Sequence, residues 1–229
     1  MGKTVIEKIL AQRSSEEVAA GRIVWVELDV RTARDFGGAN VVKHFDREYA
    51  GERVADPAKT FFTFDCNVPA NTIAYARNQQ VCREFARRQG IRVYDVDMGI
   101  GSHVLIDEGL CQPASTVVGT DSHLNLLGAV GALGQGMGDQ DIAFAFRTGR
   151  TWFEVPATIR VEITGSYEFP TTAKDVTLAV LRELGSQGAL GKAVEFTGDA
   201  VEALSLDGRI TLASMVTEMG GITGLITPD

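Results

Sequence analysis

Short apolar runs alternate with amphipathic stretches along most of the chain. Apolar residues recur at helical spacing in 5–10, which predicts an opening helix. Residues 23–30 form a nearly continuous β-branched run that is typical of a buried strand. A second run, 60–65, precedes a segment of helix formers, 70–89, that ends at Gly90. The pattern therefore predicts strand–turn–helix units.

The same alternation continues to the end of the chain. Further strands are expected at 91–97, 115–118, 158–165, 193–198 and 224–226, and further helices at 123–133, 139–147, 172–184 and 208–219. This order is typical of an α/β fold, a layered αβα domain with helices on both faces of a largely parallel sheet. The turn at 166–170 is the best candidate boundary, which divides the chain into an α/β domain, 1–165, and a second α/β segment, 166–229.

Charge and hydropathy exclude some classes of partner. The chain has 229 residues with 22 basic and 30 acidic side chains, a formal charge of −8, and no cluster of lysines or arginines. Because phosphate neutralisation supplies most nucleic-acid affinity, we expect no nucleic-acid partner. No window approaches 18 uninterrupted apolar residues and the first eleven residues lack the apolar core of a signal peptide, so we expect no membrane partner and a cytoplasmic location.

The three cysteines, Cys66, Cys82 and Cys111, are widely spaced, and the sequence contains no CxxC pair. An odd number at such spacing encodes neither a disulfide framework nor a zinc ribbon. We therefore expect a reducing compartment and no metal ligands in this chain.

Polar residues follow three of the predicted strands, at 65–66, 99–103 and 120–123. Ligands of parallel α/β folds bind at the carboxyl ends of strands, so these positions are candidate site residues. Asp121, Ser122 and His123 offer a carboxylate, a hydroxyl and an imidazole at a helix start, which suits an anionic substrate. Helix capping by Asp121 or Ser122 explains the same residues equally well.

Glycines recur between 119 and 138, but the run contains neither GxGxxG nor GxxxxGK[ST]. Close helix packing around 128–131 and a turn at 134–138 account for them better than nucleotide binding does.

Several long motifs together resemble the aconitase superfamily. They include Asp65, Gly99-Ile100, residues 119–123, and the stretch GRTWFEVP at 149–156. Further matches follow in the same order and end with residues 201–205. The chain is most similar to the amino-terminal half of the large subunit of 3-isopropylmalate dehydratase, so the resemblance implies the amino-terminal portion of an aconitase-like fold.

The resemblance implies a hydro-lyase of amino-acid biosynthesis that dehydrates and rehydrates a hydroxy di- or tricarboxylic acid. In such enzymes a [4Fe-4S] cluster with one open iron acts as a Lewis acid. The partners implied are a hydroxy-carboxylate substrate, a carboxyl-terminal portion that bears the cluster, and a small swivel-domain subunit.

The resemblance also assigns roles to residues of this chain. The positions that match catalytic residues of the family are Asp65, Asp121, His123 and Glu218. The positions that match its substrate-side residues are Arg34, Asp35, Cys66, Ser102, His103 and Ser122.

Departures from the family pattern leave two functional classes open. Cys66 and Ser102 stand where the family has histidines, and Arg34 where it has glutamine or histidine. His103 stands where the family has glutamine in the ungapped match, which we prefer; a one-residue shift with a gap would instead make His103 the family histidine. The family's cluster-ligating cysteines are not in this chain. The first hypothesis is part of a catalytic hydro-lyase; the alternative is a non-catalytic or cluster-free relative that binds a small carboxylate or acts as a subunit of a larger assembly.

Overall fold

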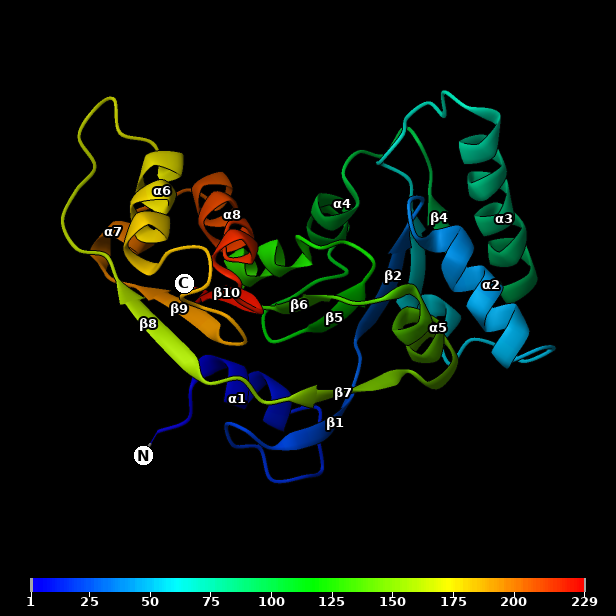
Figure 1. The fold of residues 1–229 in the computed structure, drawn as a ribbon, viewed down its shortest axis with the longest axis horizontal. Coiled ribbons are helices and arrows are strands. Elements are labelled where there is room, and N and C mark those ends of the chain that lie inside the picture. Colours follow the sequence, from blue (N-terminus) through cyan, green and yellow to red (C-terminus); the bar gives the residue numbers. More distant parts are fainter. Residues whose placement is uncertain (1, 229) are drawn as a thin grey trace.

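The computed structural model describes residues 2–228, which form two parallel sheets and one antiparallel ribbon (Figure 1). The strands are β1 (Ile23–Glu27), β2 (Val30–Arg34), β3 (Thr60–Thr63), β4 (Arg92–Tyr94), β5 (Thr116–Gly119), β6 (Leu133–Gly136), β7 (Arg150–Glu154), β8 (Thr158–Glu162), β9 (Ala193–Thr197) and β10 (Thr223–Ile226). The α-helices are α1 (Val5–Ala11), α2 (Gly38–Glu48), α3 (Ile73–Gln89), α4 (Gly101–Asp107), α5 (Asp139–Thr148), α6 (Ala173–Leu184), α7 (Asp199–Glu202) and α8 (Leu206–Ser214). Three 3₁₀ helices complete the fold: η1 (Pro57–Lys59), η2 (Leu124–Val130) and η3 (Thr217–Met219).

The larger sheet has five parallel strands in the order β4-β3-β2-β5-β6. Its central strand β2 pairs Arg34 with Thr63 of β3 on one side, and Val30 with Val117 of β5 on the other. Because all five strands run in one direction, the loops after β2, β3 and β5 emerge at the same edge. That edge carries the candidate site.

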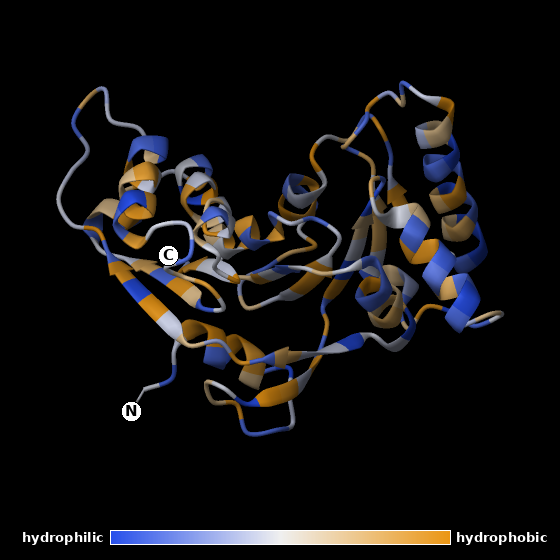
Figure 2. Ribbon diagram, viewed as in Figure 1, coloured by the Kyte–Doolittle hydropathy of each residue, from blue (hydrophilic) through white to orange (hydrophobic). Residues whose placement is uncertain are grey.

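Apolar side chains cover both faces of this sheet. Phe62 of β3 packs against Phe85 of α3 and Phe146 of α5, with ring centroids 6.1 and 5.9 Å apart. The adjacent Phe61 points to the opposite face and packs in a second core with Leu105 of α4. In Figure 2 the strands of this sheet are largely orange, whereas α2 and α3 alternate orange with blue. The predicted αβα layering with a largely parallel sheet is confirmed.

The second sheet is parallel, in the order β10-β9-β8, and has its own core, which contains Phe196 and Leu212. It meets the first sheet where η2 lies against β10. A Cβ built on Gly128 would lie only 1.6 Å from the carbonyl oxygen of Gly224, so the two backbones touch. The second sheet begins at Thr158, before the boundary expected near residue 165, and the division into two segments stays a prediction.

One predicted strand is two strands. Residues 23–30 divide into β1, which pairs with β7 in the antiparallel ribbon, and β2, which enters the large sheet. Asp29 marks the break, because its carboxylate accepts from Arg13 Nε at 2.8 Å and from the Thr116 N–H at 3.0 Å. The apolar run alone does not predict these hydrogen bonds, because their partners are distant in the sequence.

Other differences concern glycine-rich segments. The helix expected at 123–133 is the 3₁₀ helix η2, which ends at Gly131 with φ of 71°. The turn expected at 134–138 is largely strand β6, where a Cβ on Gly134 would lie 2.0 Å from the Leu124 carbonyl oxygen. The polar segment at 99–103, expected to follow a strand, leads directly into α4, so Ser102 and His103 are helical.

Smaller corrections concern lengths and two further elements. The strand expected at 91–97 is only the three-residue β4, and the helix expected at 208–219 is divided between α8 and η3. The structure adds β7 and the short α7, which the hydropathy pattern did not predict. Within residues 2–228, no helix is both long and apolar enough to cross a bilayer.

Candidate active site

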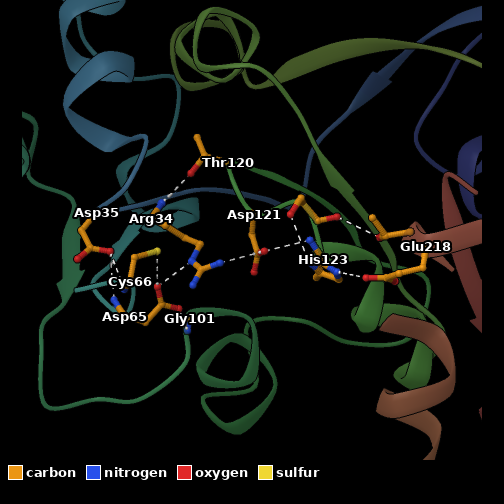
Figure 3. A network of polar contacts seen from close by, with 11 residues as sticks. Arg34, Asp35, Asp65, Cys66, Gly101, Thr120, Asp121, His123 and Glu218 are labelled. Carbon is orange, nitrogen blue, oxygen red and sulfur yellow. Dashed lines mark hydrogen bonds and ion pairs between the residues drawn. The ribbon is translucent and has the colours of Figure 1, made fainter. Parts of the chain in front are cut away.

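A continuous row of polar contacts runs along the carboxyl edge of the large sheet (Figure 3). It links Arg34 at the end of β2 with the loops that follow β3 and β5. On the far side it reaches η3 through Glu218. Eight of the ten residues expected at the site belong to this row: Arg34, Asp35, Asp65, Cys66, Asp121, Ser122, His123 and Glu218.

Arg34 lies between two aspartates. Its Nε donates to Oδ1 of Asp65 at 2.7 Å, and its Nη1 lies 3.1 Å from Oδ1 of Asp121. The side chains of Asp65 and Asp121 are only 2% and 6% exposed. Burial disfavours the guanidinium charge, but the two carboxylates outweigh it and raise the pKa of Arg34. The group is therefore permanently charged, and its Nη2 makes no hydrogen bond to any residue that the structure describes.

Asp35 is fully buried and organises the loop after β3. Its Oδ1 accepts the backbone N–H of Asp65 at 3.2 Å and that of Cys66 at 3.0 Å. Its Oδ2 accepts from Nε2 of Gln79 at 2.9 Å. These three contacts fix the loop after β3, and whether Asp35 also binds substrate stays a prediction.

The Cys66 thiol donates to Oδ1 of Asp65, with 3.3 Å between sulfur and oxygen. Local desolvation of the thiol raises the pKa of Cys66 to about 12; Arg34 opposes this shift and Asp65 adds to it. The thiol is therefore protonated near neutral pH. In this structure it is a weak hydrogen-bond donor to Asp65.

His123 connects the two sheets. Its Nε2 lies 2.9 Å from Oε1 of Glu218, and its Nδ1 lies 3.2 Å from Oγ of Ser122. An ionised carboxylate only accepts, so Nε2 carries a proton and Nδ1 of the neutral ring accepts from the Ser122 hydroxyl. The backbone N–H of His123 donates to Oδ1 of Asp121 at 3.0 Å, and Thr217 Oγ1 donates to the Ser122 carbonyl at 3.2 Å.

Ser122 also borders a hollow of about 370 Å³. The residues that line it come from the loop after β5, from the end of β6 and the loop after it, and from the segment around η3: Thr120, Ser122, 135–138, Thr217, Gly221 and Ile222. This volume is within the range of small-molecule pockets.

Ser102 and His103 are not in the row of contacts. Ser102 is 3% exposed, and its Oγ has no partner among the described residues. Nδ1 of His103 is also buried and unpartnered there. The link from α4 to the site is a backbone group, because the Gly101 N–H donates to Oδ2 of Asp65 at 2.6 Å. Whether either side chain binds substrate stays a prediction.

Two other contributors to the site are hard to predict from the sequence. Gln79 is 3% exposed on the inner face of α3, where it and the buried Gln89 interrupt a stripe formed by Cys82, Phe85 and Ala86. That interruption is a signal that inspection of the helix pattern is able to detect. The Gly101 backbone N–H carries no sequence signal, because every residue except proline has one.

The cysteines do not fit an iron–sulfur cluster. Cys82, on α3, is buried in one core, Cys111 is buried in the core on the opposite face of the sheet, and Cys66 is exposed at the site. Desolvation raises the pKa of Cys82 and of Cys111 to about 12, and cluster ligation needs thiolates that converge.

Within residues 2–228, the one set of three close potential metal ligands is Asp35, Asp65 and Cys66. Protein donors and Arg34 already occupy their carboxylates. These contacts stabilise the loop after β3, and the absence of a metal ligand set in this chain stays a prediction.

Residues 7–229 match the model of the aconitase family (aconitate hydratase). The chain belongs to the aconitase family. It is 43% identical over 230 residues to the 3-isopropylmalate dehydratase large subunit 1 of Methanopyrus kandleri, with 100% of this chain and 55% of the relative covered. It is 42% identical over 229 residues to the probable methanogen homoaconitase large subunit of Methanothermobacter thermautotrophicus, covering 97% of this chain and 53% of the relative.

This aconitase-family chain therefore spans about half the length of the curated relatives it matches. Among solved structures, the holo form of aconitase X from Thermococcus kodakaraensis aligns with a TM-score of 0.54 and 13% identity, covering 97% of this chain and 57% of that chain. At that identity the likeness concerns the fold alone. Aconitase-family proteins generally bind a [4Fe-4S] cluster, and this chain lacks a cysteine set that ligates one within its described residues.

Proposed function

We propose that this chain supplies the proton-transfer and carboxylate-binding side of a hydro-lyase that dehydrates and rehydrates a hydroxy di- or tricarboxylic acid. A 3-isopropylmalate dehydratase-like isomerisation is the specific reaction proposed, and the cytoplasm is its proposed location. The observation that carries the proposal is the pairing of His123 with Glu218 beside Ser122, in a chain that belongs to the aconitase family.

His123 is the proposed acid for the leaving hydroxyl. Glu218 holds the proton on Nε2, so a second proton on the ring resides at Nδ1, the nitrogen beside Ser122. Glu218 stabilises the imidazolium that carries this proton. The proton then passes from Nδ1 to the substrate hydroxyl, the C–O bond breaks as water leaves, and the ring returns to its neutral form while the base proposed below removes the C–H proton. Cys66 is a poor alternative acid, because its thiol has a pKa raised to about 12.

Arg34 is the proposed partner of a substrate carboxylate. Two of its nitrogens face Asp65 and Asp121, and Nη2 remains available within the described part of the chain. A guanidinium edge binds a carboxylate with well-defined geometry. Asp65 and Asp121 hold this edge in place, and Ser122 offers its hydroxyl to the same ligand.

The complete enzyme is proposed to need further protein. The matched relatives are named as large subunits and are nearly twice as long as this chain. We propose that a carboxyl-terminal portion bears the [4Fe-4S] cluster, because the cysteines here do not fit one. A small subunit completes the proposed assembly and contributes the base for the C–H proton.

The test is an assembly assay. The chain is combined anaerobically with the carboxyl-terminal portion and the small subunit of the Methanopyrus kandleri relative, and hydration of isopropylmaleate and of methyl- and unsubstituted maleate is followed. The assembly is expected to be active, and His123→Ala is expected to lower its activity at least about a hundredfold. The control is His44→Ala, which changes an imidazole on α2 that contacts Arg47 and lies outside the row of contacts.

Turnover that is equal in His123→Ala and in the unaltered assembly would show the proposed acid to be wrong. An assembly that forms and loads its cluster but hydrates none of these acids would favour the alternative, a non-catalytic relative that binds a small carboxylate. The chain alone is expected to be inactive, since it provides neither the Lewis acid nor the C–H base.

A further inference from the structure

Arg34 stands between two loops that carry candidate catalytic residues. We propose that Arg34 is a positioning residue that mechanically couples the loop after β3 to the loop after β5, so that neither moves without the other. The inference rests on the proposed function for its purpose, but the coupling itself belongs to the chain without ligand.

The bridge joins the two neighbours of the central strand. Arg34 ends β2, Asp65 follows β3 on one side, and Asp121 follows β5 on the other. One guanidinium contacts both carboxylates, at 2.7 and 3.1 Å. In the described part of the chain no other cation forms an ion pair with either aspartate. Two nearly buried anions thus depend on one positive group, and displacing either of them leaves a buried charge unpaired.

Each aspartate passes the constraint on through a backbone amide. Asp65 uses its other oxygen, Oδ2, to accept the Gly101 N–H that begins α4, at 2.6 Å. Asp121 accepts the His123 N–H at 3.0 Å. Two successive contacts therefore connect Arg34 to α4 on one side, and two connect it to His123 on the other.

The backbone of Arg34 strengthens the link on the β5 side. Its N–H donates to Oγ1 of Thr120 at 2.9 Å, which fixes the residue to the loop after β5 whatever its side chain. The side chain then extends to Asp65 and makes the contact with the loop after β3. Loss of the guanidinium is consequently expected to free the β3 loop from the β5 loop, while β2 remains in the sheet.

Neither aspartate contacts an imidazole ring within residues 2–228, since Asp121 contacts His123 only through its backbone. A guanidinium does not release its proton under ordinary conditions. Arg34 therefore positions these groups and transfers no proton. Within the row of contacts, His123 is the residue whose imidazole is able to transfer one.

The coupling is tested by NMR hydrogen exchange on the ligand-free chain. Arg34→Gln is expected to speed exchange of both the Gly101 and the His123 amides by about tenfold, the loss of roughly one charge-assisted hydrogen bond. Arg34→Lys keeps the charge but has a single ammonium, so it is expected to protect no more than one of the two amides. The matched control is Arg83→Gln, which removes a two-pronged contact to Asp95 at 2.7 and 2.6 Å elsewhere on α3 and is expected to change neither amide.

A second measurement does not depend on whether the Arg34→Gln variant folds. Asp65→Asn is expected to shift the His123 amide resonance in the unaltered chain and to leave it unchanged in the Arg34→Lys background. The proposal is overturned if Arg34→Gln affects only one amide or neither, if Arg34→Lys protects both, if Arg83→Gln acts equally, or if Asp65→Asn leaves His123 unmoved. Because no ligand or turnover is involved, these outcomes are independent of the assembly assay, and failure of one proposal does not decide the other.

Discussion

Nε2 of His123 lies 2.9 Å from Oε1 of Glu218, although 95 residues separate the two in the chain. His123 follows a strand of the large sheet, and Glu218 lies on η3, just before the last strand of the second sheet. The pair forms only when η2 and β10 are in contact. The geometry of the site therefore depends on how the two sheets pack against each other.

That packing depends on Gly128. A methyl group there would collide with the Gly224 carbonyl oxygen, so Gly128→Ala is expected to destabilise the fold by at least about 2 kcal/mol through overpacking. Chemical denaturation measures the change. Gly2→Ala is the control, because nothing lies within 4 Å of a Cβ at that position, and it is expected to change stability by less than about 0.5 kcal/mol. Equal stability of both variants would contradict the contact.

A dicarboxylate is expected to bind weakly to the chain alone. Arg34 offers a donor, and so does Nδ1 of His123 when the ring is protonated at mildly acidic pH. His123→Ala is expected to weaken a malate-like ligand there by on the order of tenfold, about one charge-assisted hydrogen bond. Titration calorimetry measures the affinity, with His44→Ala as the control. If the unaltered chain shows no heat of binding, the Asp121–His123 segment is a structural turn and not a carboxylate site.

Cys66 is expected to react slowly despite its exposure. A pKa raised to about 12 leaves little thiolate near neutral pH, so alkylation by iodoacetamide at pH 7.5 is expected to be at least about a hundred times slower than that of free cysteine. The rate rises with pH as thiolate forms. Mass spectrometry of the alkylated peptide gives the rate, with Cys66→Ser as the blank. A rate equal to that of free cysteine would mean that the thiol is not perturbed.

Anaerobic reconstitution of the chain alone with iron and sulfide is expected to give no stoichiometric cluster. Cys66, Cys82 and Cys111 lie in separate environments and do not converge. Iron analysis and visible absorption after desalting provide the measurement. A retained cluster, lost in a Cys82→Ser variant, would show that the chain rearranges to ligate metal.

Asp29 is expected to make the fold acid-sensitive. Desolvation opposes its charge, but the Arg13 guanidinium and the Thr116 N–H outweigh it and lower the pKa of Asp29. A carboxyl with a lowered folded-state pKa stabilises the fold above its unfolded value, near 4, and that stabilisation is lost as the pH falls through the folded value.

Asp29→Asn is therefore expected to reduce the free energy of unfolding by roughly 1–3 kcal/mol at pH 7, with the two proteins converging well below pH 4. Denaturation at a series of pH values tests this. Asp97→Asn changes an exposed aspartate for which no hydrogen bond occurs among the described residues, and it serves as the control. A difference that persists unchanged at low pH would assign the effect to something other than the charge.

The sequence predicted the fold class and the edge of the sheet that bears the site, and the reason is geometric. Asp65 and Asp121 each follow a buried strand, and the ends of parallel strands share one edge. The strand order was not predictable in this way. That Arg34 lies between both aspartates follows from β2 being central, a long-range result that local hydropathy does not encode.

Glycine-rich segments were the other obstacle. Strand β6 carries Gly134 and Gly136, residues that normally disfavour strands. They are needed because the Leu124 and Asp121 carbonyl oxygens occupy the space a Cβ would take, at 2.0 and 2.5 Å. The close approach of another backbone segment explains why glycine occurs at these positions, and the local sequence pattern does not identify that segment.

The pairing of Arg34 with Thr63 has a consequence for how the sheet assembles. A slip of β2 by one residue would carry Asp35 into the place of Arg34, and three carboxylates would then crowd together without a cation. The misregistered sheet is penalised by charge repulsion in addition to the loss of apolar burial. The two ion pairs of Arg34 thus add to the free-energy difference between the observed register and one shifted by a residue.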